Sequence, residues 1–186
     1  MVSNGGPRLS VKLSVVAVFS ALIALSTVLS IPLPQPLGEL TWAPPIYLAL
    51  SVLAGSEVGF WSTGIGSFIG ESLNIPLKGF PPIYALGIVW ARAPEALIVG
   101  WARKKSRRTL VAAMVLATLF ETLAFFFPDW LFYSKGLFYG SQNEGLVPGF
   151  WAASFDLLTM VDLVFIPAAL LIIQRARPEF TRLGFA

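Results

Sequence analysis

The chain has 186 residues, of which 56% are apolar and only 12% are charged. An average soluble domain carries about 25% charged residues, so this composition predicts an integral membrane protein with lipid around its helices. Cysteine and histidine are absent, which excludes disulfides, thiol nucleophiles, imidazole bases and His/Cys metal sites. The net charge of +3 does not indicate nucleic acid as a partner, because the basic residues flank apolar segments. We expect no cofactor and no metal.

The hydropathy pattern predicts one all-α membrane domain over residues 1–186, a compact bundle of about six transmembrane helices. The predicted helices are residues 11–31, 42–55, 57–73, 82–102, 109–127 and 150–173. A helix needs about 20 residues to cross roughly 30 Å of hydrocarbon, and the second and third segments are short. We expect them to form two spans that turn at Gly55-Ser56-Glu57; a re-entrant hairpin is the alternative.

The distribution of lysine and arginine predicts the orientation. With the N-terminus in the cytoplasm and six spans, ten basic residues lie inside: Arg8, Lys12, Arg103, Lys104, Lys105, Arg107, Arg108, Arg175, Arg177 and Arg182. Only Lys78 and Lys135 lie outside. The positive-inside rule therefore favours both termini in the cytoplasm. A hairpin in place of the second and third spans would put residues 103–108 on the wrong side.

The first helix carries a stripe of small side chains on one face. Ser14, Ala17, Ala21 and Ala24 follow one another at spacings of three or four residues. Small residues let another helix approach closely in lipid. The stripe either packs against a neighbouring span of this chain or docks onto a separate membrane subunit.

Charged residues within the fourth and sixth helices are a second notable feature, since ionisable groups in a membrane are costly. Arg92 lies near mid-bilayer with Glu95 three residues further on, a spacing that allows a structural ion pair. Asp162 in the sixth helix is expected to pair with Arg92 instead.

Two further carboxylates are expected at one depth near the outer face. Glu121 lies about six residues inside the outer end of the fifth helix, taken as residue 127, and Asp156 about six inside the outer end of the sixth. Each is then roughly 9 Å deep at 1.5 Å per residue. They either line a pocket or bond hydroxyl groups of neighbouring helices.

The segment between the fifth and sixth helices is long and aromatic. Residues 128–149 include Trp130, Phe132, Tyr133, Phe138 and Tyr139. The segment is either an interfacial aromatic belt or a lid over a site that opens outward.

Together these residues predict a shallow substrate pocket with acidic and amide groups and an aromatic rim. Its expected members are Trp42, Glu71, Asn74, Tyr84, Glu121, Trp130, Phe150, Trp151 and Asp156. Such a pocket suits a small aromatic ligand with polar or cationic groups.

This layout, with the Ala-xxx-Ala motif of Ala17 and Ala21 in the first helix, resembles the substrate-binding S component of energy-coupling factor (ECF) vitamin transporters. The resemblance implies a protein of the prokaryotic plasma membrane, not an enzyme, that binds a vitamin-like small molecule beneath its outer loops. It also implies a transmembrane coupling (T) subunit, contacted through the first helix, and two ATPase subunits.

The excess of carboxylates over Arg92 favours a thiamine-like aromatic cation as the ligand, with riboflavin next. The alternative function is a stand-alone secondary transporter or channel for a small solute, with Arg92, Glu95 and Asp162 as an ion relay; the chain has no evident inverted repeat that would favour it. A membrane-embedded enzyme would have few catalytic groups without histidine or cysteine.

Overall fold

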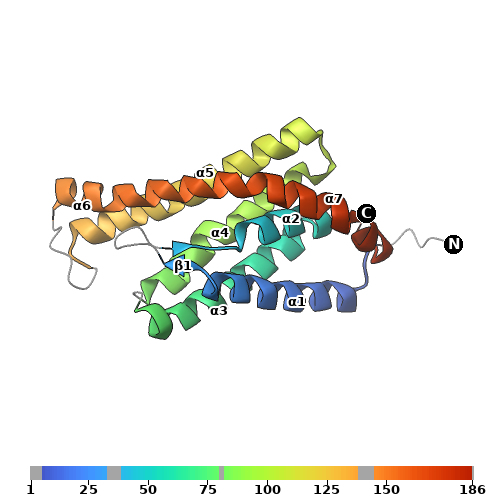
Figure 1. The fold of residues 1–186 in the computed structure, drawn as a ribbon, viewed down its shortest axis with the longest axis horizontal. Coiled ribbons are helices and arrows are strands. Elements are labelled where there is room, and N and C mark those ends of the chain that lie inside the picture. Colours follow the sequence, from blue (N-terminus) through green and yellow to red (C-terminus); the bar gives the residue numbers. More distant parts are fainter. Residues whose placement is uncertain (1–5, 33–38, 80–81, 138–144, 186) are drawn as a thin grey trace.

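A computed structural model of the chain describes residues 6–32, 39–79, 82–137 and 145–185 (Figure 1). Phe138 and Tyr139 of the predicted aromatic segment lie outside these residues. The helices are α1 (Leu9–Val28), α2 (Pro44–Ala54), α3 (Ser56–Lys78), α4 (Ile83–Trp101), η1 (Ala102–Lys104), α5 (Arg107–Ser134), α6 (Leu146–Ala153), η2 (Ser154–Phe165) and α7 (Ile166–Arg182). Two short strands, β1 (Ile31–Pro32) and β2 (Glu39–Leu40), pair antiparallel after α1.

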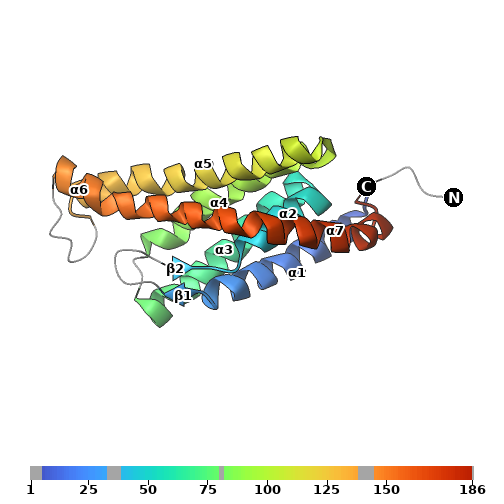
Figure 2. The same ribbon diagram turned by 45° about the horizontal axis from the view of Figure 1, so that its top comes forward.

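The chain forms a helical bundle, as predicted, in which α6, η2 and α7 follow one another as a single sixth helix. Four of the six helices are long and apolar enough to cross a membrane: Leu9–Val28, Ile83–Lys104, Arg107–Ser134 and Leu146–Arg182. The α2 helix has 11 residues, about 16 Å at 1.5 Å per residue, which is shorter than the bundle. The extended chain before α2 continues this crossing of the bundle (Figures 1 and 2).

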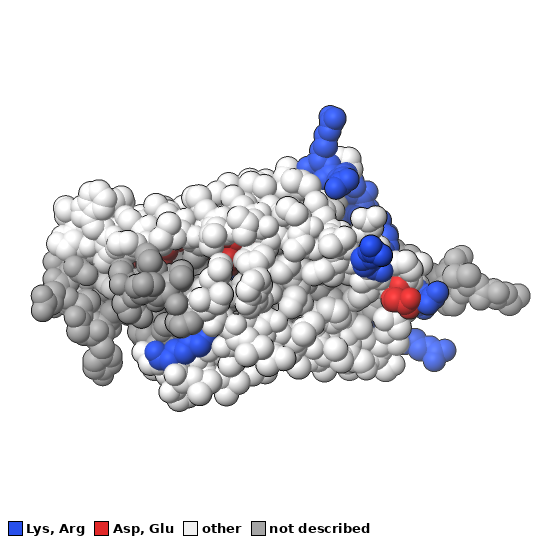
Figure 3. All heavy atoms as spheres, viewed as in Figure 1, with Lys and Arg blue, Asp and Glu red and all other residues white. Residues whose placement is uncertain are grey.

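Both chain termini lie at the same end of the bundle (Figure 1). Lysine and arginine side chains gather at that end (Figure 3), which is the arrangement that an even number of passages produces. On the face shown, away from this end, acidic atoms are visible only in hollows between other side chains (Figure 3).

The α2 and α3 helices are separated by Gly55 alone. Its φ of +94° lies in a region that side chains other than glycine rarely adopt. This single residue makes the turn that the sequence predicted at 55–57.

Glycines in α3 allow α1 to pack closely against it. A Cβ atom on Gly66 would lie 2.7 Å from the Ser20 carbonyl oxygen, and one on Gly70 would lie 2.6 Å from Thr27 Cβ. Any larger side chain would therefore push the two helices apart.

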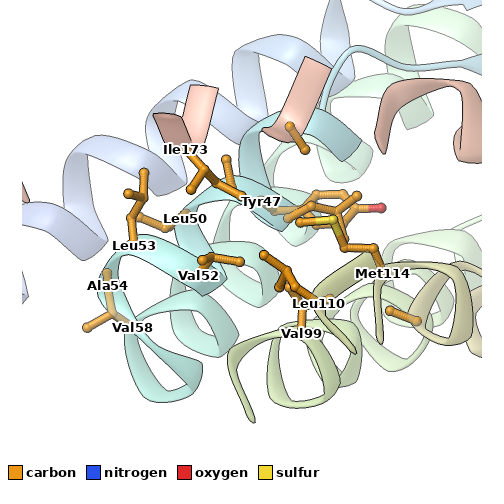
Figure 4. Packing of buried hydrophobic residues seen from close by; sticks show 14 of the residues in the cluster. Tyr47, Leu50, Val52, Leu53, Ala54, Val58, Val99, Leu110, Met114 and Ile173 are labelled. Atoms are coloured by element: carbon orange, nitrogen blue, oxygen red, sulfur yellow. The ribbon is translucent and has the colours of Figure 1, made fainter. Parts of the chain in front are cut away.

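The apolar core centres on α2. Tyr47, Leu50 and Leu53 are buried there against Val99 of α4 and Met114 of α5 (Figure 4). The hydroxyl of Tyr47 lies at the opposite end of this cluster from Leu53 (Figure 4), and so reaches toward the polar interior described below.

The fifth helix is longer than the sequence predicted. It begins after Ser106, whose Oγ accepts a hydrogen bond from the Thr109 amide at 3.2 Å, but it ends at Ser134 instead of residue 127. Pro128 lies inside it. Proline removes one backbone hydrogen-bond donor but is tolerated within membrane helices where neighbouring groups compensate. The part of α5 after Pro128 packs against α6, as the contact of Trp130 with Leu146 shows. The expected 22-residue loop is correspondingly shorter.

Candidate functional site

The η2 segment aligns three polar side chains on one face of the sixth helix. Asp156, Thr159 and Asp162 are spaced three residues apart within its 12 residues. A 3₁₀-helix has three residues per turn, so side chains at i, i+3 and i+6 lie in one line, whereas an α-helix would rotate them apart. Such long 3₁₀ runs are uncommon and often mark functional segments. We call these three residues the η2 polar ridge.

The ridge faces α5, and acidic groups of the two helices meet at two levels. Asp156 lies beside Asp129, and Asp162 lies close to Glu121. The two levels match because the two pairs are equally far apart along their helices. Asp156 and Asp162 are six residues apart in η2, at about 2.0 Å per residue, and Glu121 and Asp129 are eight apart in α5, at about 1.5 Å per residue, so both separations are about 12 Å. The prediction that Glu121 and Asp156 share one level is therefore wrong, because α5 continues beyond residue 127.

The outer level joins α4, α5 and η2. The Tyr84 hydroxyl donates to Asp129 Oδ2 at 3.3 Å, and the carboxyl groups of Asp129 and Asp156 lie within hydrogen-bonding reach of each other. One turn deeper, Thr159 Oγ1 donates to Thr122 Oγ1 at 2.8 Å. These contacts hold the ridge against α5.

The inner level is built around a salt bridge between α4 and α5. Arg92 Nε donates to Glu121 Oε1 at 2.8 Å, and both side chains are buried. Arg92 Nη2 also donates to Thr41 Oγ1 at 3.4 Å, and the Tyr47 hydroxyl donates to Glu121 Oε2 at 3.5 Å. Asp162 is close enough to Arg92 to attract it.

The predicted ion pair between Arg92 and Glu95 is wrong, because Arg92 turns to α5 instead. Glu95 is completely buried; neither of its carboxylate oxygens forms a hydrogen bond of ordinary geometry with a described residue, although the Tyr47 hydroxyl lies within reach of it. Arg92 Nη1 is also buried and has no hydrogen-bond partner among the described residues. A buried acceptor and a buried donor thus remain available in one region, which is the arrangement expected where a ligand binds.

Aromatic side chains lie at the end of the bundle away from the termini. Trp130 and Phe150 have ring centroids 5.4 Å apart, and Trp130 Nε1 donates to the Leu146 carbonyl at 2.8 Å, joining α5 to α6. Further into the bundle, where η2 ends, Trp42 packs edge-on against Phe165 at 5.7 Å and is about half exposed. Trp151 is 67% exposed, so it faces outward.

Glu71 and Asn74 lie at a different place from the other predicted site residues. Both are buried at the contact of α3 with α1. Asn74 Nδ2 donates to Glu71 Oε2 at 3.2 Å and to the Thr27 carbonyl at 3.4 Å. These contacts stabilise the packing of two helices, and we do not include the pair in the candidate site.

The small-residue stripe of α1 is divided between two faces. Ser14, Ala17 and Ala21 are exposed, so none of the described helices covers them. Ala24 is 6% exposed and lies against Gly70, since a Cβ there would be 2.9 Å from the Ala24 carbonyl oxygen. Ala24 therefore belongs to internal packing and not to a docking surface.

Sequence reasoning missed five residues that the structure places in the site. Thr41, Tyr47, Thr122 and Asp129 contact Arg92, Glu121, Thr159 and Tyr84, and Thr159 itself is the fifth. Asp129 was assigned to a loop because it follows a proline. The others are neutral, and the search for charged groups within helices passed over them.

The fold and the site define a small helical membrane protein with a buried polar centre and an aromatic end. Residues 9–148 match the family model of the ECF-type riboflavin transporter S component, and the chain belongs to that family. A solved structure titled "Structure and mechanism of the S component of a bacterial ECF transporter" matches with a TM-score of 0.67 at 17% sequence identity, covering 92% of this chain and 98% of that chain. No curated protein matches.

These comparisons confirm the predicted family and the all-α membrane fold. A member of this family is a transporter component, not an enzyme. The preference for a thiamine-like ligand is not confirmed, because the matching family is described by riboflavin.

Proposed function

We propose that this chain is the substrate-binding subunit of an ECF-type importer and that its ligand is riboflavin. The observation that carries the proposal is the match of residues 9–148 to a riboflavin transporter family. The chemistry of the candidate site supports it in three ways.

The ring system of riboflavin is flat and aromatic, and the aromatic end of the bundle offers partners for it. Trp130 with Phe150 forms an edge-on ring pair at that end, and Trp42 with Phe165 forms another further into the bundle, where η2 ends. A flat ligand gains dispersion and quadrupole energy by stacking on such rings. Because Trp42 is about half exposed, its face is available to a ligand.

The ribityl chain of riboflavin carries several hydroxyl groups, which are hydrogen-bond donors. The η2 polar ridge and its α5 neighbours present acceptors, among them Asp156 Oδ2, which is buried and has no partner in the described residues. Hydrogen bonds to carboxylates are stronger than those between neutral groups. A neutral polyol therefore suits this acidic wall, and an anionic ligand does not.

The inner level offers both a donor and an acceptor. Within the described residues, Arg92 Nη1 and the Glu95 carboxylate are buried without a well-formed hydrogen bond, and the uracil-like edge of a flavin carries an N–H group between two carbonyl oxygens. A site built to hydrogen-bond such an edge rejects molecules that lack it, because its own polar groups are then left unpaired.

The membrane orientation and the partners complete the proposal. The basic end with both termini faces the cytoplasm of a prokaryote, so the aromatic end faces outward and receives the vitamin. The exposed Ala17 and Ala21 contact a transmembrane coupling subunit, and two ATPases supply the energy for release inside.

A second ligand class has one observation in its favour. Around the inner salt bridge, Glu95, Glu121 and Asp162 outnumber the single guanidinium of Arg92. A cation in this region would favour the ionised forms of these carboxyl groups, so thiamine is the competitor that the test includes.

The experiment is a titration of the purified, ligand-free protein with riboflavin, followed by quenching of flavin fluorescence. We expect saturable binding, at least tenfold weaker binding of flavin mononucleotide because its phosphate is repelled by the carboxylates, and no competition by thiamine at the same concentration. Saturable binding of thiamine with none of riboflavin would contradict the proposed ligand while leaving the importer role intact.

A further inference from the structure

The outer end of α5 and the α6 helix are joined to each other. The Gly145 amide donates to the Ser134 carbonyl at 3.0 Å, and the indole hydrogen bond described above joins the same two segments. Gly149 lies so close to Ser134 that a Cβ atom on it would be 2.7 Å from the Ser134 amide nitrogen. Hydrogen bonds and close packing thus make one unit of residues 129–134 and 145–153, which we call the outer arm.

Both helices are irregular at the point where the outer arm begins. Pro128 lies inside α5, and the sixth helix changes from α to 3₁₀ geometry at Ser154. The two positions are at one level, because Asp129 lies beside Asp156. Helices bend at internal prolines, and a 3₁₀ stretch within a helix often marks a hinge. The two helices can therefore bend together at this level.

The outer arm extends beyond the rest of the bundle. Figures 1 and 2 both show α6 and the adjoining end of α5 past the ends of α3 and α4. The α6 helix packs chiefly against α5 and η2. Parts of a fold that make few contacts with the remainder are the ones that open at low cost in free energy. The position of the arm therefore depends on the contacts at its base.

Two sets of contacts at the base hold the arm to the bundle. The Tyr84 hydroxyl of α4 donates to Asp129 Oδ2 at 3.3 Å, and the Asp129 carboxyl group lies within hydrogen-bonding reach of Asp156. The Phe150 ring packs edge-on against Phe126, which precedes the proline of α5, with 5.7 Å between centroids. A single hydrogen bond contributes little net free energy, so contacts as few as these can break and re-form while the helices stay folded.

The arm covers the outer end of the η2 polar ridge. Asp156 is the outermost member of the ridge, and its Oδ2 is inaccessible to solvent and has no hydrogen-bond partner among the described residues. A ligand that arrives from the aromatic end has to reach this atom. Since Asp129 belongs to the arm and lies beside Asp156, bending of the arm separates the two carboxyl groups and uncovers the ridge.

We propose that the outer arm opens and closes about Pro128 and Ser154 to admit the ligand, and that the hydrogen bond from Tyr84 to Asp129 is the contact that keeps it closed. Opening moves Asp129 away from Asp156, and closing buries the ridge again. The inference rests on the proposed function only in taking the ridge as the place where riboflavin binds, because the movement of the arm needs no ligand.

Binding kinetics test the arm as a gate. Tyr84→Phe removes the hydroxyl and keeps the ring, and riboflavin binding is followed by stopped-flow quenching of flavin fluorescence. We expect the association and dissociation rate constants both to rise at least threefold with less than a twofold change in Kd, because easier opening speeds entry and exit alike. The control is Ser20→Ala, which removes a hydrogen bond of 3.3 Å from α1 to the Ser62 carbonyl of α3 and should change neither rate constant by more than twofold.

Stiffening the hinge should have the opposite effect. Pro128→Ala restores the missing backbone donor and straightens α5, so we expect both rate constants to fall at least threefold. Pro178→Ala, within α7 at the basic end, is the matched control and should leave both within twofold of the unaltered protein. Circular dichroism checks that each variant folds.

A distance measurement tests the movement without any ligand. The sequence has no cysteine, so two introduced cysteines can be spin-labelled specifically. Val147→Cys on the arm and Leu86→Cys on α4 are exposed positions, and Leu116→Cys on α5 with Leu86→Cys is the control pair. By pulsed electron paramagnetic resonance of the ligand-free protein, we expect Tyr84→Phe to add a second, longer distance to the arm pair and to leave the control pair with one distance.

The outcomes separate the arm from the ligand. One arm distance, the same with and without the Tyr84→Phe change, together with unchanged rate constants would overturn the proposal. Faster dissociation alone, with a weaker Kd, would also overturn it, because Tyr84 would then be a direct ligand contact. Two arm distances in a protein that does not bind riboflavin would support the arm and contradict the proposed ligand.

Discussion

Arg92 and Glu121 form a salt bridge in the interior of the bundle, with 2.8 Å between Nε and Oε1 and only 8% and 1% of the two side chains exposed. The pair joins α4 to α5. Each charge makes the other tolerable, since a lone ionised group is expensive within a membrane.

Replacing Glu121 with Gln should therefore destabilise the protein strongly. Loss of one partner of a buried pair leaves the other charge uncompensated, which typically costs about 3–5 kcal/mol. The matched control is Glu57→Gln, which breaks the exposed pair with Lys12 and should cost about 0–1 kcal/mol. Thermal unfolding in detergent measures both, and equal shifts would show that the buried pair does not stabilise the bundle.

Substitution of the α3 glycines should separate α1 from α3. Gly66→Ala places a methyl group 2.7 Å from the Ser20 carbonyl oxygen, and overpacking of this kind typically costs about 1–3 kcal/mol. Gly87 in α4 provides the control, because a Cβ there meets nothing within 4 Å. Gly87→Ala should raise stability by up to about 1 kcal/mol through helix propensity. A neutral effect of Gly66→Ala would mean that the two helices are not in tight contact.

The sequence was sufficient to predict the family and the helix count. Charge asymmetry required an even number of passages even where hydropathy was weak, and both termini do lie at one end (Figure 1). Ala17 and Ala21 are exposed, as a docking surface requires.

The depth of the site residues was not predictable in the same way. Pro128 was interpreted as a helix end, although the helix continues to Ser134, and this error moved Glu121 to the wrong level. The 3₁₀ geometry of η2 was also hidden, because its hydropathy pattern does not distinguish 3.0 from 3.6 residues per turn over 12 residues. The pairing of side chains across helices, such as that of Arg92 with Glu121, depends on where each helix ends and on how many residues it has per turn.

Large side chains on the exposed stripe of α1 should block assembly of the transporter. Ala17→Trp or Ala21→Trp should abolish co-purification with the ECF coupling subunit, because close helix contact needs small residues, while riboflavin binding stays unchanged. Leu116→Trp, at a 59% exposed position of α5, is the control and should leave assembly intact. Complex formation by both alanine variants at the level of the control would remove this face as the docking surface.

Removal of a site carboxylate should weaken ligand binding without unfolding the chain. Asp156→Asn keeps the shape of the side chain but replaces a carboxyl acceptor of the η2 polar ridge with an amide, and we expect riboflavin affinity to fall at least tenfold, about 1.4 kcal/mol. The control is Glu179→Gln, on the exposed part of α7, which should bind riboflavin as tightly as the unaltered protein does. If Asp156→Asn also bound riboflavin with unaltered affinity, the η2 polar ridge would lie outside the site.

The most direct measurement is mass spectrometry of the small molecule that co-purifies with the protein after expression in a vitamin-producing host. A riboflavin transporter S component with the site described here should retain riboflavin, in an amount approaching one molecule per chain, together with the absorption spectrum of a flavin. Recovery of thiamine or of another vitamin in that amount, without a flavin, would contradict the assignment.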